Sequence, residues 1–374
     1  MAVLRSERLA AFLLIGAAAV GLIIANTPIG PAVIAGTHIH FGFPGLDLSA
    51  AHWVTDGLLA VFFFLAAIEL KHELTRGELS SAHKAVVPAA AAVGGVIVPA
   101  LIYLAVVHDP KLTIGWPIPT ATDIAFALGI LALVGRGLPS RVRALLLALA
   151  VLDDLIAILI IAIFFTAGLQ LLPLLLAIPV IAAFGLLSRL RQTAPIVVVL
   201  VLLGMAAWLL VALSGIHPTI AGVALGLAMA GTSGGRARHT LEPVSNGFIL
   251  PVFAFVAALV ALPSAGLAEL SPAFWAIVIA LPVGKLIGIT AGASIAIAAG
   301  RRRSGDALPL GDIVAVASLG GIGFTVSLLM NQLAWAGNTE LADEGTLAVI
   351  VASVIAVVIG GLVTAARSRH YRRI

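Results

Sequence analysis

Residues 145–167, LLLALAVLDDLIAILIIAIFFTA, constrain this chain more than any other stretch. As a helix, the stretch is long and apolar enough to cross a hydrocarbon core about 30 Å thick. Yet Asp153 and Asp154 lie near its middle, where one aspartate costs about 2.5–3.5 kcal/mol on insertion scales. Each ionised carboxylate also disfavours ionisation of the other. A helix needed only for packing would carry leucine there, so the pair predicts a site for something that crosses the membrane.

The composition is that of an integral membrane protein. The 374 residues are 61% hydrophobic and 10% charged, whereas soluble domains are about 45–50% apolar and about 25% charged. Apolar runs of about 20 residues indicate helices, because barrel strands would be alternating segments of about 10 residues. The chain has no cysteine, which excludes disulfides, thiol catalysis and zinc–thiolate sites. Its basic residues lie in short loops and form no patch, so nucleic acid is not an expected partner.

Hydropathy predicts one all-α membrane transporter domain over residues 1–374, with about twelve transmembrane helices. The predicted spans lie near residues 9–26, 52–70, 85–107, 113–134, 143–167, 171–188, 194–213, 216–231, 247–262, 272–299, 310–335 and 346–366.

The positions of lysine and arginine predict the topology. If the N-terminus is cytoplasmic, every basic residue falls on the cytoplasmic side except Lys111, which is external, and Lys285, which lies within a span. This segregation follows the positive-inside rule and predicts an even number of spans with both termini cytoplasmic. Cleavage of the first span as a signal peptide is the alternative and would leave eleven spans.

Three kinds of polar segment connect the spans. Residues 33–48 predict an external β-hairpin or loop, because THIHFGF alternates and Phe43-Pro44-Gly45 is typical of a turn. The polar stretches 232–246 and 300–310 are interpreted as connectors, and residues 367–374 as a basic cytoplasmic tail.

Spans 4 and 11 are predicted to be interrupted in mid-membrane. Span 4 contains WPIPTATD, with two prolines followed by polar residues, and span 11 contains SLGGIGFTVS. Open backbone at this depth is tolerated only if it is buried in protein or lines a wet cavity. The two spans are the middle members of triplets 3–5 and 10–12, which cross in opposite directions in the predicted topology. Such a pair is typical of an inverted-repeat transporter whose site lies at the bilayer midplane.

Four ionisable residues fall well within spans: Asp123, Asp153, Asp154 and Lys285. A purely structural salt-bridge cluster is the plainer interpretation, but three carboxylates against one lysine are unbalanced. Carboxylates supply the hard oxygen ligands that a small alkali cation prefers, and the Thr122 hydroxyl and open backbone can complete the set. Desolvated carboxylates near a like charge also bind protons. Competition between cation and proton for one site would produce exchange.

Residue roles within this set remain open from the sequence alone. Lys285 can neutralise an aspartate when no cation is bound, or carry a proton itself. Asp123 and Lys285 can instead cap the half-helices. We favour capping for Asp123 and a direct role in transport for Lys285.

Several motifs, in this order, resemble the NhaA family of sodium/proton antiporters: DGLLAVFFFLAAIELKHEL, WPIPTATDIAFALGIL, AVLDDLIAILIIAIF, SGIHPTIAGVALG, LPVGKLIGIT and LGGIGFTVSLL. NhaA is itself one of the transporters from which the rule of paired interrupted helices was drawn. The resemblance implies twelve helices, of which the two interrupted ones cross each other, and electrogenic, pH-regulated exchange of Na⁺ or Li⁺ for H⁺. It also implies a bacterial inner membrane, no cofactor and a homodimer formed through the external hairpin.

The same resemblance implies individual roles. Asp154 resembles the main cation ligand and Asp153 the residue that pairs with Lys285. The remaining matched positions are the crossing residues Thr122 and Asp123 and those tied to pH response, His217, Glu69, Glu73 and Glu242. The chain departs from the family pattern at LAAIE, where a glycine is usual, and at FAFVAALV, where FANAG is usual.

Other interpretations remain open. A sodium-coupled symporter on the same architecture needs room for an organic substrate. An intramembrane aspartyl enzyme needs carboxylates from separate helices. His217 can be a plain interfacial residue, and Glu69 and Glu73 only a charged helix end. His38 and His40 are expected on the hairpin surface.

Overall fold

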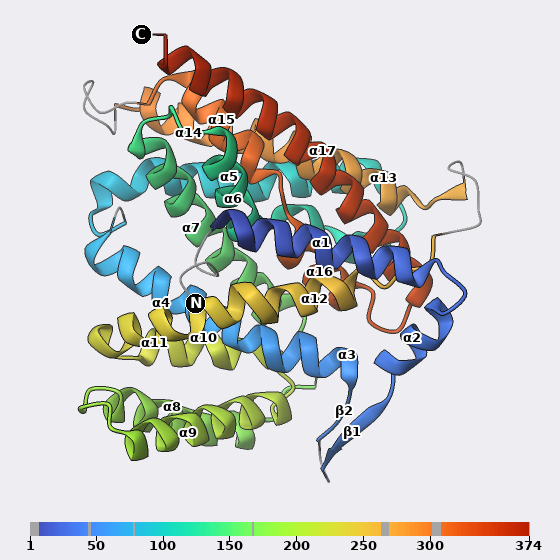
Figure 1. Ribbon diagram of the computed structural model, residues 1–374, viewed down its shortest axis with the longest axis vertical. Helices are drawn as coiled ribbons and strands as arrows, with labels where there is room; N and C mark the ends of the chain where they lie inside the picture. Colours follow the sequence, from blue (N-terminus) through green and yellow to red (C-terminus); the bar gives the residue numbers. More distant parts are fainter. Residues whose placement is uncertain are drawn as a thin grey trace.

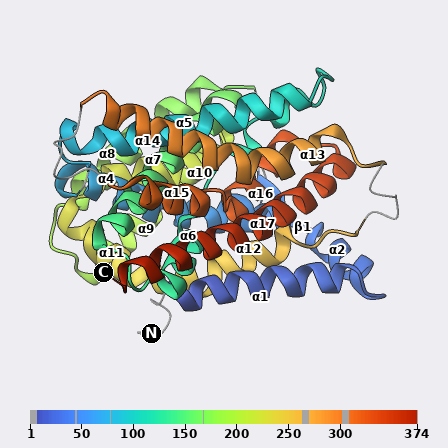
Figure 2. The same ribbon diagram turned by 90° about the horizontal axis from the view of Figure 1, so that it is seen from above.

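A computed structural model describes residues 7–43, 46–77, 79–166, 168–262, 269–300 and 308–373. Long helices run side by side across the molecule, from left to right in Figure 1, and a two-stranded hairpin projects at one end. Seen from above, the same helices form several stacked layers (Figure 2). The arrangement is that of a helical bundle whose helix axes lie across a membrane.

The first half of the chain contains α1 (Glu7–Ala25), α2 (Gly30–Thr37), β1 (His40–Phe43), β2 (Leu46–Ser49), α3 (Ala50–His52), the π-helical turn η2 (Trp53–Leu58), α4 (Leu59–Arg76), α5 (Ala82–Val106), the 3₁₀ turns η3 (Thr113–Gly115) and η4 (Ile118–Thr120), α6 (Ile124–Val134), α7 (Ser140–Phe164) and α8 (Leu171–Leu187).

The second half contains α9 (Ala194–Leu213), α10 (Thr219–Ala228), α11 (Gly231–Val244), the π-helical turn η5 (Ser245–Ile249), α12 (Leu250–Ala257), α13 (Pro272–Ile279), the π-helical turn η7 (Ala280–Gly284), α14 (Lys285–Ala298), α15 (Leu310–Gly320), α16 (Phe324–Ala334) and α17 (Thr339–Tyr371).

The predicted class, a polytopic all-helical membrane protein, is confirmed. Within the described residues, nine helical segments are long and apolar enough to cross a membrane, and the pair α15–α16 makes a tenth if counted as one span. The remaining two predicted spans coincide with α8 and α10, which are apolar but shorter. The count of twelve crossings and the inverted repeat therefore stay predictions.

Close packing of glycine faces positions the helix that carries Lys285. On α14, Gly288 and Gly292 lie so close to the backbone of α5 that a Cβ atom at either would collide with Gly94 or Ala90. Small residues at this spacing allow helix backbones to approach closely in membranes. Just before Lys285, Gly284 packs against Pro99 of α5 in the same way. These contacts leave α14 little freedom to rotate or shift.

Both segments that were expected to be interrupted are interrupted in the structure. Proline fixes its own φ and lacks an N–H, and Pro117 and Pro119 lie where η3 and η4 replace an α-helix. The chain is then extended at Ala121 until α6 begins. In the other segment, α15 and α16 meet at an angle of 47° around residues 321–323. The two breaks touch each other, because the Asp123 N–H donates to the Ile322 carbonyl at 2.6 Å.

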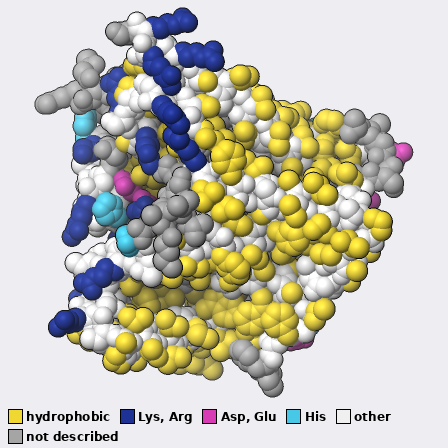
Figure 3. All heavy atoms as spheres, viewed as in Figure 1, with side chains coloured by type: hydrophobic (Ala, Val, Ile, Leu, Met, Phe, Trp, Pro, Cys, Tyr) yellow, Lys and Arg dark blue, Asp and Glu magenta, His cyan; other side chains and the backbone are white. Residues whose placement is uncertain are grey.

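Lysine and arginine gather on one side of the molecule, at the left of Figure 3, and an apolar belt covers the rest of the visible surface. We call this side the basic face; it is where α1, α5 and α7 begin and α17 ends (Figure 1). On the face shown, basic residues are therefore segregated to one side, as predicted. Arg5, Arg301, Arg302 and Arg303 lie outside the described residues.

Three predicted connections differ from the structure. Residues 231–244 are not a loop but helix α11, which continues through η5 into α12. Hydropathy alone did not reveal this helix, because its sequence is polar on average. Residues 30–37 form α2, so the hairpin is only β1 and β2, and its turn residues 44–45 lie outside the described part. Most of the predicted tail, up to Tyr371, continues α17.

Candidate ion-binding site

A buried ion pair joins α7 to α14 at the centre of the bundle. Lys285 Nζ donates to both carboxylate oxygens of Asp153, at 2.8 and 2.6 Å. Both side chains are removed from solvent, Lys285 completely. Charges in such surroundings are tolerated only when they are paired and hydrogen-bonded. The structure thus places Lys285 on Asp153, the pairing that the resemblance implied.

Asp154 is the next residue on α7 and has a different environment. Neighbouring positions on a helix point about 100° apart, so Asp154 does not share the lysine. Both of its carboxylate oxygens are buried and have no hydrogen-bond partner among the described residues. Asp153 and Asp123 are both close enough to interact with it electrostatically. An unpartnered buried carboxylate beside two others is a place where a cation or a proton is needed.

Asp154 also lines a cavity of about 210 Å³ that continues towards the basic face. Along α7 the lining runs from Asp154 back to Arg143, a distance of about 16 Å for a helix of this length. Three further charged residues line the same cavity: Glu69, Arg238 and Glu242. A water-sized cation therefore has a route between this face and Asp154.

The two interrupted segments meet beside the ion pair. The Thr122 hydroxyl donates to the carbonyl of Gly320, the last residue of α15, at 2.7 Å. Asp123 is the N-cap of α6, where its Oδ1 accepts from Phe126 N–H at 2.9 Å. Its Oδ2 accepts from both the N–H and the hydroxyl of Thr325, at 3.1 and 2.7 Å. One carboxylate therefore faces the positive N-termini of α6 and α16 together.

Replacement of Asp123 by alanine should destabilise the fold, because it removes a helix cap and leaves two buried donors of Thr325 without an acceptor. Each such unsatisfied group costs about 1–3 kcal/mol. We expect a clearly lowered midpoint of thermal unfolding for Asp123→Ala in detergent, and an intermediate value for Asp123→Asn, which keeps one acceptor oxygen. Equal midpoints for the parent protein and Asp123→Ala would contradict the capping role.

A second group of charges surrounds the mouth of the cavity. Arg238 of α11 binds Glu69 of α4 at 2.5 Å and lies 3.8 Å from Glu242, one turn along its own helix. Glu73 follows one turn after Glu69, is buried, and lies 3.8 Å from His72. Arg143 and Arg238 were not singled out from the sequence. The spacing of Arg238 and Glu242 by four residues was a usable signal, since such pairs meet on a helix face.

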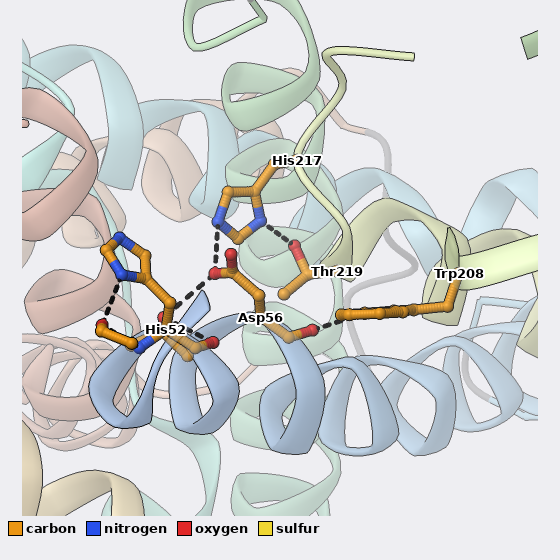
Figure 4. A network of polar contacts seen from close by, with 7 residues as sticks. His52, Asp56, Trp208, His217 and Thr219 are labelled. Atoms are coloured by element: carbon orange, nitrogen blue, oxygen red, sulfur yellow. Dashed lines mark hydrogen bonds and ion pairs between the residues drawn. The ribbon is translucent and has the colours of Figure 1, made fainter. Parts of the chain in front are cut away.

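His217 lies far from the cavity, near the end of the molecule that carries the hairpin. Its Nε2 is 3.3 Å from Asp56 Oδ1, and its Nδ1 is 2.7 Å from the Thr219 hydroxyl. Figure 4 shows His217 above Asp56, with the indole of Trp208 reaching the Asp56 carbonyl from the other side. The partners Asp56 and Trp208 were not predicted, because nothing in their local sequence marks them.

Together, a bundle of membrane-crossing helices, two broken segments in contact, and a central charged site open to one face define a membrane transport protein for a small ion. The model of the Na⁺/H⁺ antiporter 1 family matches residues 1–364, and the chain belongs to this family. The alternatives of a symporter and an aspartyl enzyme find no support in this membership.

Antiporters from several bacteria resemble the chain over nearly its whole length. It is 56% identical to the Na(+)/H(+) antiporter NhaA 2 of Clavibacter michiganensis subsp. michiganensis, over 99% of this chain and 93% of the relative. It is 45% identical to the Na(+)/H(+) antiporter NhaA of Tropheryma whipplei (strain Twist), over 96% of this chain and 94% of the relative. The corresponding protein of Thermobifida fusca is 44% identical, over 99% and 94%.

Proposed function

We propose that the chain exchanges Na⁺ or Li⁺ for H⁺ across the bacterial inner membrane, without a cofactor and with both termini cytoplasmic. The observation that carries this proposal is the pair of unpartnered, buried oxygens of Asp154 at the wall of the cavity. Family membership and the names of the relatives support the choice of ions. On this assignment the basic face is cytoplasmic, as the positive-inside rule expects.

The arrangement suggests how the two ions compete. A cation that reaches Asp154 gains two hard oxygen ligands, while Thr122 and the opened backbone lie beside the neighbouring Asp153. Asp153 is held by Lys285 in the described arrangement, so a cation that also uses Asp153 must displace the lysine. Protons bound by the aspartates or by Lys285 restore neutrality when no cation is present. Net charge crosses the membrane in each cycle, so transport responds to voltage by about 2.3 kcal/mol per charge per 100 mV.

Proteoliposomes that contain the purified protein and a trapped pH-sensitive dye test this function. With an imposed pH gradient, we expect addition of Na⁺ or Li⁺ to collapse the gradient, and K⁺ to have little effect. Empty liposomes are the control. Dissipation that is the same with all three cations, or absent with Na⁺ and Li⁺, contradicts the proposal.

We further propose that the mouth residues Glu69, Glu73 and Glu242 and the distant His217 contribute to pH response. In the described arrangement the His217 imidazole contacts both Asp56 of η2 and Thr219 of α10, so it joins these two elements. His217→Gln and Asp56→Asn should therefore shift the pH profile of exchange in the same direction, because each removes the same contact. The rate of dye dequenching measured across a range of pH tests this. Profiles that shift in opposite directions would show that the two residues act separately.

A homodimer formed through the β1–β2 hairpin is also proposed. The hairpin exposes the apolar side chains of Ile39 and Phe41, which are 62% and 52% exposed. Light scattering of the purified protein should give twice the chain mass of 38.1 kDa after correction for detergent, and a monomeric mass would contradict the dimer.

A further inference from the structure

The end of α17 is hydrogen-bonded to the first turn of α15 through the buried carboxylate of Asp312. Asp312 has no exposed surface, and each of its oxygens accepts one hydrogen bond. Arg367 Nε donates to Oδ1 and the Tyr371 hydroxyl donates to Oδ2, both at 2.7 Å. The guanidinium carbon of Arg367 lies 4.9 Å from the centroid of the Tyr371 ring, so the two donors also hold each other.

The same turn of α17 also holds the loop that joins α6 to α7. The Gly137 N–H donates to Ser368 Oγ at 2.9 Å, and Ser368 is almost fully buried. A Cβ atom at Gly137 would lie only 2.7 Å from the Ser368 carbonyl oxygen, so the loop must carry glycine to come this close. We call Asp312, Arg367, Ser368 and Tyr371 the α17 clasp.

Both helices held by the clasp lead directly to the candidate ion site. α15 ends at Gly320, whose carbonyl accepts the Thr122 hydroxyl, and α6 begins at its cap Asp123. Each of these helices has 11 residues, which makes it about 16 Å long. Helices this short move as rigid rods, so a shift at the clasp displaces the crossing residues by a similar amount.

α17 follows α15 over its whole length, as Figures 1 and 2 both show. At the far end, Gly360 packs against the backbone of Ser318 and the side chain of Leu319. The contacts of α17 with α15 therefore begin at the clasp and end beside the crossing. Side-chain packing alone would allow α15 to slide along α17, whereas the directional bonds to Asp312 set its position along the axis.

We propose that the α17 clasp positions the inner halves of both broken segments and thereby sets the affinity of the site for its cation. This inference rests on the proposed exchange function. Asp312, Arg367 and Tyr371 are positioning residues, since none of them lines the cavity that contains Asp154. Their loss should change the cation concentration that the site requires, and not only the stability of the protein.

The test compares Arg367→Gln and Tyr371→Phe with Arg369→Gln, in the same proteoliposome assay. Arg369 lies on the same turn of α17 but is exposed, which makes it a matched control. Because changes along a coupling network alter affinity by roughly two- to thirtyfold, we expect Arg367→Gln to raise the half-maximal Na⁺ concentration by at least about threefold. Tyr371→Phe should have a smaller effect in the same direction, Arg367→Lys an intermediate one, and Arg369→Gln none.

Thermal unfolding in detergent separates affinity from stability. If Arg367→Gln fails to fold because the buried Asp312 loses its only described cationic partner, the double variant Asp312→Asn/Arg367→Gln and the mild Tyr371→Phe carry the test. If folded variants show the parent's half-maximal Na⁺ concentration, the proposal that the α17 clasp sets cation affinity is wrong. Normal exchange by the parent protein would then leave the proposed function intact. If the parent protein shows no Na⁺-driven proton movement, both the proposed function and the proposed effect of the clasp are wrong, because that effect is on the affinity of the ion site.

Discussion

Asp154→Asn is expected to abolish Na⁺- and Li⁺-driven proton movement in proteoliposomes while leaving the protein folded. Asparagine has the same shape, but it cannot supply a negative charge to a cation and does not exchange a proton at these pH values. Because both oxygens of Asp154 lack partners, no hydrogen bond of the described residues is lost. Removal of a buried charge next to Asp153 also relieves repulsion, so thermal stability should be unchanged or raised.

The matched control is Asp47→Asn, the same chemical change at an exposed position in β2. We expect this variant to exchange at the parental rate. Retention of parental exchange by Asp154→Asn, with both ions and across the pH range, would remove Asp154 from the cation site. A loss of exchange that accompanies unfolding would instead point to a structural role.

Lys285→Met should strongly destabilise the protein. The substitution keeps an unbranched side chain, one atom shorter than that of lysine, but leaves Asp153 buried beside Asp154 without its cation. Breaking a buried pair by removing one partner costs about 3–5 kcal/mol, mostly from the charge left behind. The expected result is a large fall in the unfolding midpoint in detergent, together with loss of exchange.

The double variant Asp153→Asn/Lys285→Met separates stability from transport. Removal of both charges should restore most of the lost stability, since replacing a complete buried pair by uncharged residues is often nearly neutral. The non-additivity of the two substitutions measures their coupling. If Lys285 has the direct role that we favour, the rescued double variant stays inactive or exchanges with altered voltage dependence. Parental exchange in a stable double variant would show that the pair serves only the fold.

Much of the site could be predicted because charges in a membrane span are conspicuous. Asp123, Asp153, Asp154 and Lys285 each lie in an apolar segment, where their insertion needs a reason. The two interruptions were predictable because several helix-breaking signals coincide there, two prolines before a polar stretch in one segment and three glycines within four residues in the other. A single proline was not enough, since Pro88 and Pro99 both lie inside the continuous helix α5. The tertiary structure then revealed ion pairs that leave no signal in the sequence. The Asp56–His217 pair and the Asp312–Arg367 pair join segments that are far apart in the chain, and their members look like ordinary helix-end residues.

Helix α11 is an element that hydropathy failed to predict. Its sequence, GTSGGRARHTLEPV, is polar enough to resemble a connector, yet it forms a helix. Its Arg238 reaches Glu69 on α4, and the buried Ser233 hydroxyl donates to the Ser188 carbonyl at 2.6 Å. Contacts of this kind stabilise a helix whatever its hydropathy, because packing overrides intrinsic preference.

The sequence by itself determined that this chain is a helical membrane protein and that two carboxylates lie side by side within one of its helices. It did not determine which carboxylate meets Lys285, since a helix with both residues can be rotated to present either one. Only the tertiary structure decided this pairing: the close approach of α14 to α5 brings Lys285 onto Asp153 and leaves Asp154 facing the cavity. The physical reason is that the partner of a side chain depends on helix rotation, which is set by packing against distant segments and not by neighbours in sequence.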